Sequence, residues 1–132
     1  MGTIVVGYVP KPEGDAALDQ AISEAKLRGA SLVVVNSHRG GDSLDADAAT
    51  RTEQHLQRVE KRLKDSGVEF ELKHLVRGFE PAEDLIKTAE AAQADLIIIG
   101  LRRRTPVGKL ILGSNAQRIL LDAHCPVLAV KA

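Results

Sequence analysis

The sequence predicts an α/β domain built on an open, five-stranded parallel sheet with helices on both faces. Strand and helix patterns alternate along the chain, which is typical of parallel strands joined by crossover helices. Most strand patterns are short, almost wholly apolar runs rich in β-branched residues, as expected for strands covered on both faces. With 132 residues the chain has the length of one such domain, and we expect residues 1–132 to form it.

Glycine and proline punctuate the expected elements, and apolar residues at helical spacing mark the helices. We expect Pro12 and Gly14 to break the chain before the first helix, and Pro81 to occupy the favoured first position of the third. The expected strands are Thr3–Tyr8, Ser31–Ser37, Glu69–Val76, Asp95–Gly100 and Pro126–Ala132. The first expected helix runs from Asp15 to near Gly29. The second carries the apolar stripe Leu56, Val59 and Leu63 and stops at Gly67. The third begins at Pro81 and extends past Ala89, and the fourth covers Ser114–Ala123.

The third strand pattern, "EFELKHLV", indicates the strand order. It alternates between Phe70 and Leu72 on one face and Glu71 and Lys73 on the other, as an edge strand would. Right-handed crossovers leave few topologies, and the order 3-2-1-4-5 places this strand at an edge. Open sheets of this kind bind ligands where the strand order reverses. We therefore expect a crevice flanked by the loops after strands one and four, at residues 9–13 and 101–112.

Composition excludes several classes of function. The net charge is +0 and aromatic residues are scarce, which argues against a surface for nucleic acid or for a membrane. The single cysteine, Cys125, allows no internal disulfide and fits a reducing compartment. We see neither a signal-peptide pattern nor an apolar run long enough to cross a bilayer. We expect a soluble cytoplasmic protein without a nucleic-acid or membrane partner.

The segment "DLIIIGLRRRTPVGKLILGSNAQRIL" carries the features of a phosphate cradle. A buried strand ends in Gly100, and the loop that follows is longer than the roughly 2–6 residues usual for a strand-to-helix connection. Gly113 and Ser114 then place free backbone N–H groups and a hydroxyl at a helix N-terminus, where an anion is favoured. Three consecutive arginines lie in the loop between them. This order of glycine, basic charge and helix start predicts phosphate binding.

Simpler interpretations remain open for these residues. "SNAQ" also fits a capping box, in which Ser114 and Gln117 satisfy the donors of their own helix. The arginines would then be solvated, and Gly7 would be a packing glycine, an interpretation that we favour slightly over close ligand approach. His124 and Cys125 are adjacent and lack a third orienting group, so we expect no nucleophile–base pair, no catalytic set and no enzyme activity.

Beside these motifs, the chain as a whole resembles the universal stress protein family. Gly100 and the pair Gly113–Ser114 fall in register with its glycine signature. "PEGDAALDQAI", "RGFEPAEDLIKTAEAAQADLIIIG" and "HCPVLAV" resemble its first helix, its middle segment and its closing strand. The resemblance implies a Rossmann-like fold of the adenine-nucleotide-hydrolase type and a small dimer. It also implies two branches, one that binds ATP in the crevice and one that does not.

Three positions depart from the signature of the ATP-binding branch. Arg103 replaces its second glycine, Val9 replaces an aspartate that contacts the nucleoside, and Ala116 replaces a hydroxyl residue near the phosphates. Guanidinium groups bind phosphate oxygens well, so Arg102 and Arg103 offer partial compensation. We therefore expect weaker or less selective nucleotide binding than in a relative with the full signature.

The leading hypothesis is a homodimer that binds ATP, with or without Mg, as a regulatory ligand. Phosphates would contact Ser114 and the backbones of Gly113 and Asn115, with Gly100, Arg102 and Arg103 nearby. The base pocket would be lined by Val9, Pro10 and Val35.

The apolar closing strand, at the second edge of the sheet, predicts pairing with its copy through Val127–Val130. The alternative is an interaction module with an empty crevice, in which the basic loop docks a protein partner. A nucleotide-processing enzyme is disfavoured because "VPKPEG" places prolines where a phosphate loop needs glycine or serine.

Overall fold

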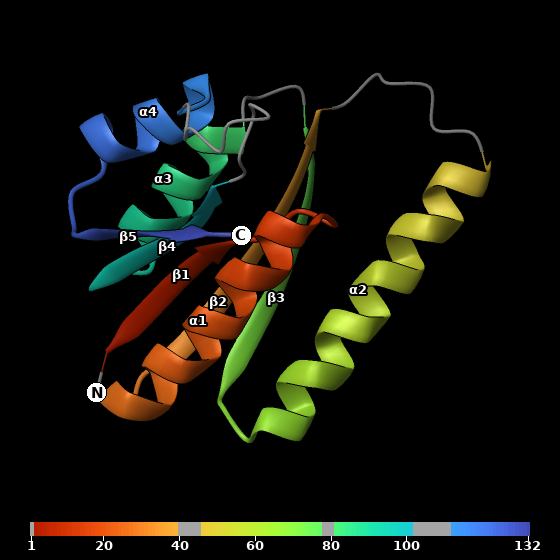
Figure 1. Cartoon of the computed structure of the whole chain (residues 1–132), viewed down its shortest axis with the longest axis horizontal. Coiled ribbons are helices and arrows are strands. Elements are labelled where there is room, and N and C mark those ends of the chain that lie inside the picture. Colours follow the sequence, from red (N-terminus) through yellow and green to blue (C-terminus); the bar gives the residue numbers. More distant parts are fainter. Residues whose placement is uncertain (1, 40–45, 78–80, 102–111) are drawn as a thin grey trace.

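The computed structural model describes residues 2–39, 46–77, 81–101 and 112–132, in which strands and helices alternate along the chain (Figure 1). None of the helices in these ranges is both long and apolar enough to cross a membrane. The strands are β1 (Thr3–Gly7), β2 (Ser31–Arg39), β3 (Phe70–Arg77), β4 (Leu96–Leu101) and β5 (Val127–Lys131). The helices are α1 (Pro12–Arg28), α2 (Ala46–Ser66), α3 (Pro81–Ala91) and α4 (Ser114–Asp122).

All five strands are parallel and follow the order β3-β2-β1-β4-β5, which confirms the predicted topology. The central strand β1 pairs with β2 on one side and with β4 on the other, so that Val5 lies between Val33 and Ile97. The strand order reverses at this β1–β4 junction. The carboxyl ends of these two strands are therefore the place where a crevice is expected.

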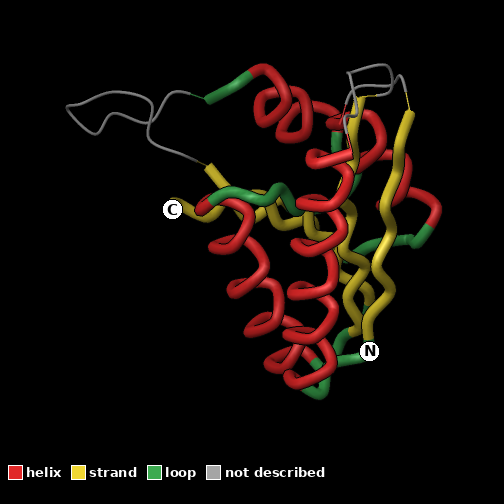
Figure 2. The backbone as a smooth tube through the Cα atoms, turned by 90° about the vertical axis from the view of Figure 1, so that its right-hand side faces the viewer, coloured by secondary structure: helices red, strands yellow, loops and turns green. Residues whose placement is uncertain are grey.

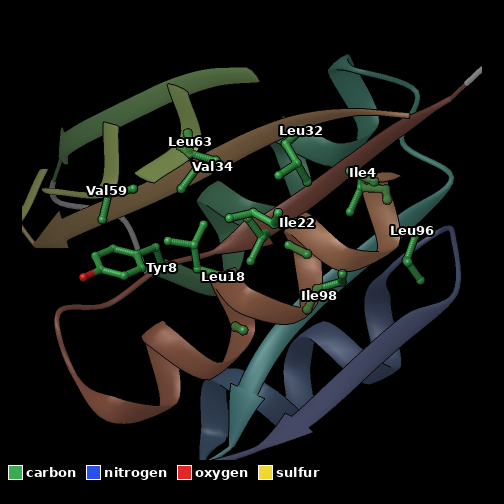
Figure 3. Close-up of a cluster of buried hydrophobic side chains, with 14 residues drawn as sticks. Ile4, Tyr8, Leu18, Ile22, Leu32, Val34, Val59, Leu63, Leu96 and Ile98 are labelled. Atoms are coloured by element: carbon green, nitrogen blue, oxygen red, sulfur yellow. The ribbon is translucent and has the colours of Figure 1, made fainter. Parts of the chain in front are cut away.

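Helices cover both faces of the sheet, as the sequence predicts. Successive side chains of each strand point to opposite faces, so each strand contributes to two hydrophobic cores. The long helices α1 and α2 run alongside the strands in both backbone views (Figures 1 and 2) and pack on one face. Figure 3 shows part of this core, in which Ile4 and Ile98 of the strands meet Leu18 and Ile22 of α1. Helices α3 and α4 pack on the other face.

The first helix begins at Pro12, three residues before the expected start at Asp15. Proline is well suited to the first turn because its missing N–H would have no helical acceptor there. Gly14, which we expected to interrupt the chain, is instead buried inside this helix. A Cβ at this position would lie 2.8 Å from the carbonyl carbon of Val9, so glycine lets the helix start against the end of β1.

The two edge strands differ in character. In β3, Phe70 and Leu72 pack against the core beneath α1 and α2 while Glu71 is exposed, in agreement with the predicted edge position. In β5, the four residues Val127–Val130 are half-buried and only Lys131 is exposed. The second edge therefore leaves apolar surface uncovered on both sides of the strand.

Candidate functional site

A cleft of about 200 Å³ opens where β1 and β4 end, at the reversal of the strand order. Its floor is formed by the strand ends, and its sides come from the first turns of α1, α3 and α4. The described residues that line it are Gly7, Tyr8, Val9, Glu13, Gly14, Val35, Pro81, Ala82, Leu85, Ile99, Gly100, Asn115, Ala116 and Ile119.

Glycines bring backbone segments close together at the floor of the cleft. A Cβ on Gly100 would lie 2.6 Å from the carbonyl carbon of Glu13, far inside normal contact. A Cβ on Gly7 would lie 3.2 Å from Leu85 Cδ2, which fits the packing interpretation of this glycine. Gly100 therefore has a structural role that the motif did not suggest, because it lets the first turn of α1 approach the end of β4.

The inner walls of the cleft are apolar. Val35 and Ile99 contribute buried side chains from the sheet, while Leu85 and Ile119 contribute buried side chains from α3 and α4. Glu13 is the acidic residue among the described lining residues. The cleft therefore combines apolar walls with one carboxylate, that of Glu13, among its described lining residues.

The N-terminus of α4 lies at the mouth of the cleft. Gly113 is the N-cap and Ser114 is the first helical residue, and no side chain caps the helix. Ser114 is not the N-cap and the Gln117 side chain donates to the Leu112 carbonyl at 3.2 Å, so the capping box that the sequence left open does not form. The first intrahelical bond runs from the Gln117 N–H to the Gly113 carbonyl at 3.0 Å. The N–H groups of Ser114 and Asn115 precede this bond and are placed to bind an anion.

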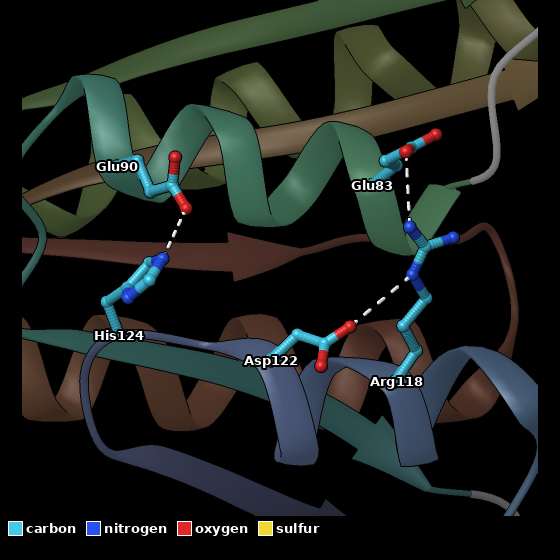
Figure 4. Close-up of polar contacts among 5 residues, drawn as sticks. All are labelled: Glu83, Glu90, Arg118, Asp122 and His124. Atoms are coloured by element: carbon cyan, nitrogen blue, oxygen red, sulfur yellow. Dashed lines mark hydrogen bonds and ion pairs between the residues drawn. The ribbon is translucent and has the colours of Figure 1, made fainter.

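An ion pair of Arg118 and a polar contact of His124 connect α4 and its C-terminal end to α3 (Figure 4). Arg118 of α4 contacts Glu83 of α3 at 3.1 Å and Asp122 of its own helix at 3.7 Å. His124, just beyond α4, lies 2.6 Å from Glu90 of α3. These side chains are partly exposed, so each pair contributes only about 0.2–1 kcal/mol. Together with the buried Ile119 they position the helix whose N-terminus faces the cleft.

The structure brings together only some of the predicted site residues. Val9, Val35, Gly100 and Asn115 line the cleft. Gly113 and Ser114 flank it at the start of α4, with the Ser114 side chain exposed. Arg102 and Arg103 lie outside the described residues.

Pro10, which we expected in the base pocket, is absent from the described lining of the cleft. The Lys11 N–H donates to the Val9 carbonyl at 2.8 Å, which makes a tight turn centred on Pro10. Pro10 consequently lines a different cavity, between α1 and α2. The same bond uses the Val9 carbonyl as its acceptor. The Val9 side chain itself remains 38% exposed at the edge of the cleft.

Sequence reasoning missed several lining residues. Ala82 and Leu85 come from the first turn of α3, whose start is placed at the cleft by its packing rather than by any local motif. Gly14 could have been predicted from the sequence. Pro12 followed two residues later by glycine is compatible with the first turn of a helix that packs closely against another backbone segment. Ala116, which was expected to weaken phosphate binding, faces the cleft and packs against the core beneath α3 and α4.

Cys125 and His124 lie at the other end of the sheet, near the start of β4, and share a cavity with Ile97 there. Burial raises the pKa of the Cys125 thiol, and the nearby Asp95 carboxylate adds to the effect. Within the described ranges, no group of three or more His, Cys, Asp or Glu side chains is arranged to hold a metal ion.

The fold and the cleft define a doubly wound α/β domain with a pocket at its topological switch point. A model of the universal stress protein family matches residues 1–131. The chain belongs to this family, which confirms the resemblance seen in the sequence.

Individual relatives match over nearly their whole length. A universal stress protein from Mycolicibacterium smegmatis is 48% identical over 128 residues, which cover 97% of this chain and 96% of the relative. A solved universal stress protein from Archaeoglobus fulgidus has a TM-score of 0.84 and 36% identity, with 99% of each chain covered. Another from the same organism, solved in complex with dAMP, has a TM-score of 0.78 and 30% identity, with 99% of this chain and 98% of that chain covered.

Proposed function

We propose that this chain is a cytoplasmic, homodimeric regulator, formed by one domain over residues 1–132, that binds an adenine nucleotide, with ATP as the leading candidate. The observation that carries this proposal is an apolar cleft that ends at the open N-terminus of α4. Such a site offers a dry surface to a base and backbone donors to phosphates. The similar A. fulgidus protein, solved with dAMP, supports the same class of ligand.

The dimensions of the cleft suggest how the nucleotide lies. Its volume of about 200 Å³ is below the roughly 300–1,000 Å³ of pockets that enclose a whole drug-sized ligand. We place the base between Val35 and Ile99, and the sugar hydroxyls near Glu13, which would supply the carboxylate that Val9 lacks. The phosphates then lie outside the cleft, against the N–H groups of Ser114 and Asn115.

From the sequence, Arg102 and Arg103 supply positive charge to the same phosphates, with or without Mg. Gly113 admits the phosphates to the helix start, while Gly100 shapes the floor. Among the described lining residues only Glu13 and Tyr8 carry groups that could act as an acid or base, and the Tyr8 hydroxyl donates to Asp15, so we propose binding rather than turnover.

The homodimer is proposed to form through β5. This edge strand exposes unpaired backbone groups and half-buried side chains over Val127–Val130. A second copy of the strand would cover both, as two-fold pairing of edges does. Val130→Lys should therefore give a monomer in size-exclusion chromatography with light scattering, and an unchanged dimer would exclude this interface.

A second candidate function is a pure interaction module that leaves the cleft empty. Two observations favour it: the Val9 carbonyl is already hydrogen-bonded within the chain, and Ala116 presents a methyl group where a hydroxyl would meet phosphate. In that case a protein partner would dock on the dimer, and ATP would not bind.

Calorimetric titration with ATP separates the two functions. We expect saturable binding that Ala116→Phe abolishes, because the ring would fill the cleft beside Asn115. Leu120→Phe is the matched control, since Leu120 lies on the same helix, is 40% exposed and is absent from the described lining of the cleft. Ser114→Ala and Arg103→Ala should each weaken binding. Absence of heat at millimolar ATP would exclude the nucleotide function, and sustained phosphate release would show an enzyme instead.

A further inference from the structure

A second cavity, of about 270 Å³, lies between α1 and α2, on the face of the sheet that these two helices cover. Lys11, Arg58 and Arg62 line it with three cationic side chains, against the single carboxylate of Asp15. His55 lines it as well. We call it the basic cavity. The chain as a whole has a net charge of +0, so this convergence of positive charge is local.

Two of these cations are not neutralised by neighbouring carboxylates. Arg62 forms an ion pair with Asp19. In contrast, within the part of the chain that the structure describes, neither Lys11 nor Arg58 lies within ion-pair distance of a carboxylate. Their charges are therefore available to an anion that enters the cavity.

The contact of Arg58 with His55 supplies a further donor. Arg58 Nη2 lies 2.6 Å from His55 Nδ1. A guanidinium group can only donate, so His55 Nδ1 must accept this bond, which leaves the proton of the neutral ring on Nε2. The guanidinium and the imidazole N–H are thus donors on adjacent turns of α2, both at the basic cavity.

Tyr8 forms the inner end of the basic cavity. Its ring packs beside Leu18 and Val59 and is 4% exposed, and its hydroxyl group lies at the outer end of the ring (Figure 3). The hydroxyl donates to Asp15 Oδ1 at 3.4 Å, which places the one carboxylate at this inner end. Pro10 and Pro12 complete an apolar rim.

We propose that the basic cavity binds a phosphate group, carried either by inorganic phosphate or by a small phosphate monoester. Phosphate offers several acceptor oxygens, which match the ammonium group of Lys11, the guanidinium of Arg58 and the Nε2–H of His55. The cavity has room for a phosphate and a small organic body, which would contact the prolines and Val59. Tyr8 also lines the cleft, but Lys11, His55 and Arg58 do not, so this site does not depend on nucleotide binding in the cleft.

Titration with inorganic phosphate and with phenyl phosphate, at constant ionic strength, tests the proposal. Calorimetry measures affinity. The spectrum of Tyr8, the one tyrosine in a chain without tryptophan, reports binding in either the cleft or the basic cavity, and the variants then locate the site. Both probes should bind saturably and perturb the Tyr8 spectrum. Arg58→Gln and Lys11→Gln should each weaken binding by about tenfold, as expected for the loss of one charge-assisted bond. Tighter binding of phenyl phosphate would identify the monoester as the ligand, and equal affinity would identify free phosphate.

Lys61→Gln is the matched control, since it removes a charge from an exposed position of the same helix that is absent from the described lining. It should leave the affinity unchanged. An effect equal to that of Arg58→Gln would show that phosphate is attracted by the overall charge of the helix and is not bound in the basic cavity. Ser114→Ala locates the bound phosphate. If this substitution abolished binding while Arg58→Gln did not, phosphate would occupy the cleft and the proposal would be wrong. Failure of ATP binding would leave the result for the basic cavity intact.

Discussion

Replacing Gly100 with alanine tests the close approach of α1 to the end of β4. The new Cβ would lie 2.6 Å from the Glu13 carbonyl carbon, whereas carbon atoms in contact are about 3.5–4.0 Å apart. The first turn of α1 must therefore retreat by roughly 1 Å, the difference between these distances. Gly100 does not have a positive φ, so alanine adds no backbone strain of its own. The cost is steric.

The retreat would loosen a helix whose Ala17, Leu18 and Ala21 are almost completely buried. Overpacking of this kind costs about 1–3 kcal/mol, and we expect about 3 kcal/mol because the obstacle is backbone rather than a flexible side chain. Urea denaturation followed by circular dichroism measures the change in the free energy of unfolding.

Gly7→Ala is the matched control for Gly100→Ala. It adds the same methyl group to the neighbouring strand, but the nearest atom is the terminal Leu85 Cδ2 at 3.2 Å, which can move. We expect a loss below about 1 kcal/mol for this variant. Equal losses for the two variants, or a loss below about 1 kcal/mol for Gly100→Ala, would refute the claim that backbone contact determines the residue at this position.

Three further outcomes follow from burial and charge. Leu63→Ala should cost about 3 kcal/mol in urea denaturation because Leu63 is completely buried, whereas Leu121→Ala, at an 82% exposed position, should cost less than about 0.5 kcal/mol. Burial, followed by the Asp15 carboxylate, raises the pKa of Tyr8, so its contribution to stability is complete below about pH 10 and is lost as the pH rises through the native pKa. Phenolate absorbance should show this pKa falling toward its ordinary value in Asp15→Asn, and an unchanged titration would contradict the assignment. Burial also raises the pKa of Cys125, so iodoacetamide at pH 8.5 should alkylate the native protein more slowly than the urea-unfolded chain, and equal rates would contradict a protected thiol.

The strand order and the position of the cleft were predictable from the sequence. The alternation of Phe70, Glu71 and Leu72 marked β3 as an edge strand. Handedness and the rule for topological switch points then determined where β1 and β4 end together. These rules act on whole elements, so small errors in element boundaries do not disturb them.

The direction of individual residues was not predictable in the same way. One backbone bond, from Lys11 to Val9, turns Pro10 away from the cleft and into the basic cavity. Ser114 and Gln117 satisfied the residue pattern of a capping box, yet the helix begins at Ser114, one residue earlier than that motif needs. The sequence pattern does not resolve a shift of one residue, although such a shift decides which group faces a ligand.

The basic cavity had no signature in the sequence. Tyr8, Arg58 and His55 come from distant segments that only the packing of α2 on the sheet brings together. The positive charges of α2 look like those of an ordinary solvated helix face when the chain is read alone.

The contact between Gly100 and Glu13 also bears on how glycine motifs identify ligand sites in this family. A glycine that the fold itself requires would persist in chains that bind nucleotide and in chains that do not. Gly100 therefore has little diagnostic value for ATP binding. Asn115 and Ala116 face the cleft from the open start of α4, and Val9 stands at its edge, so these positions are free to vary with the ligand. Classification of relatives into binding and non-binding groups should give these three positions more weight than Gly100.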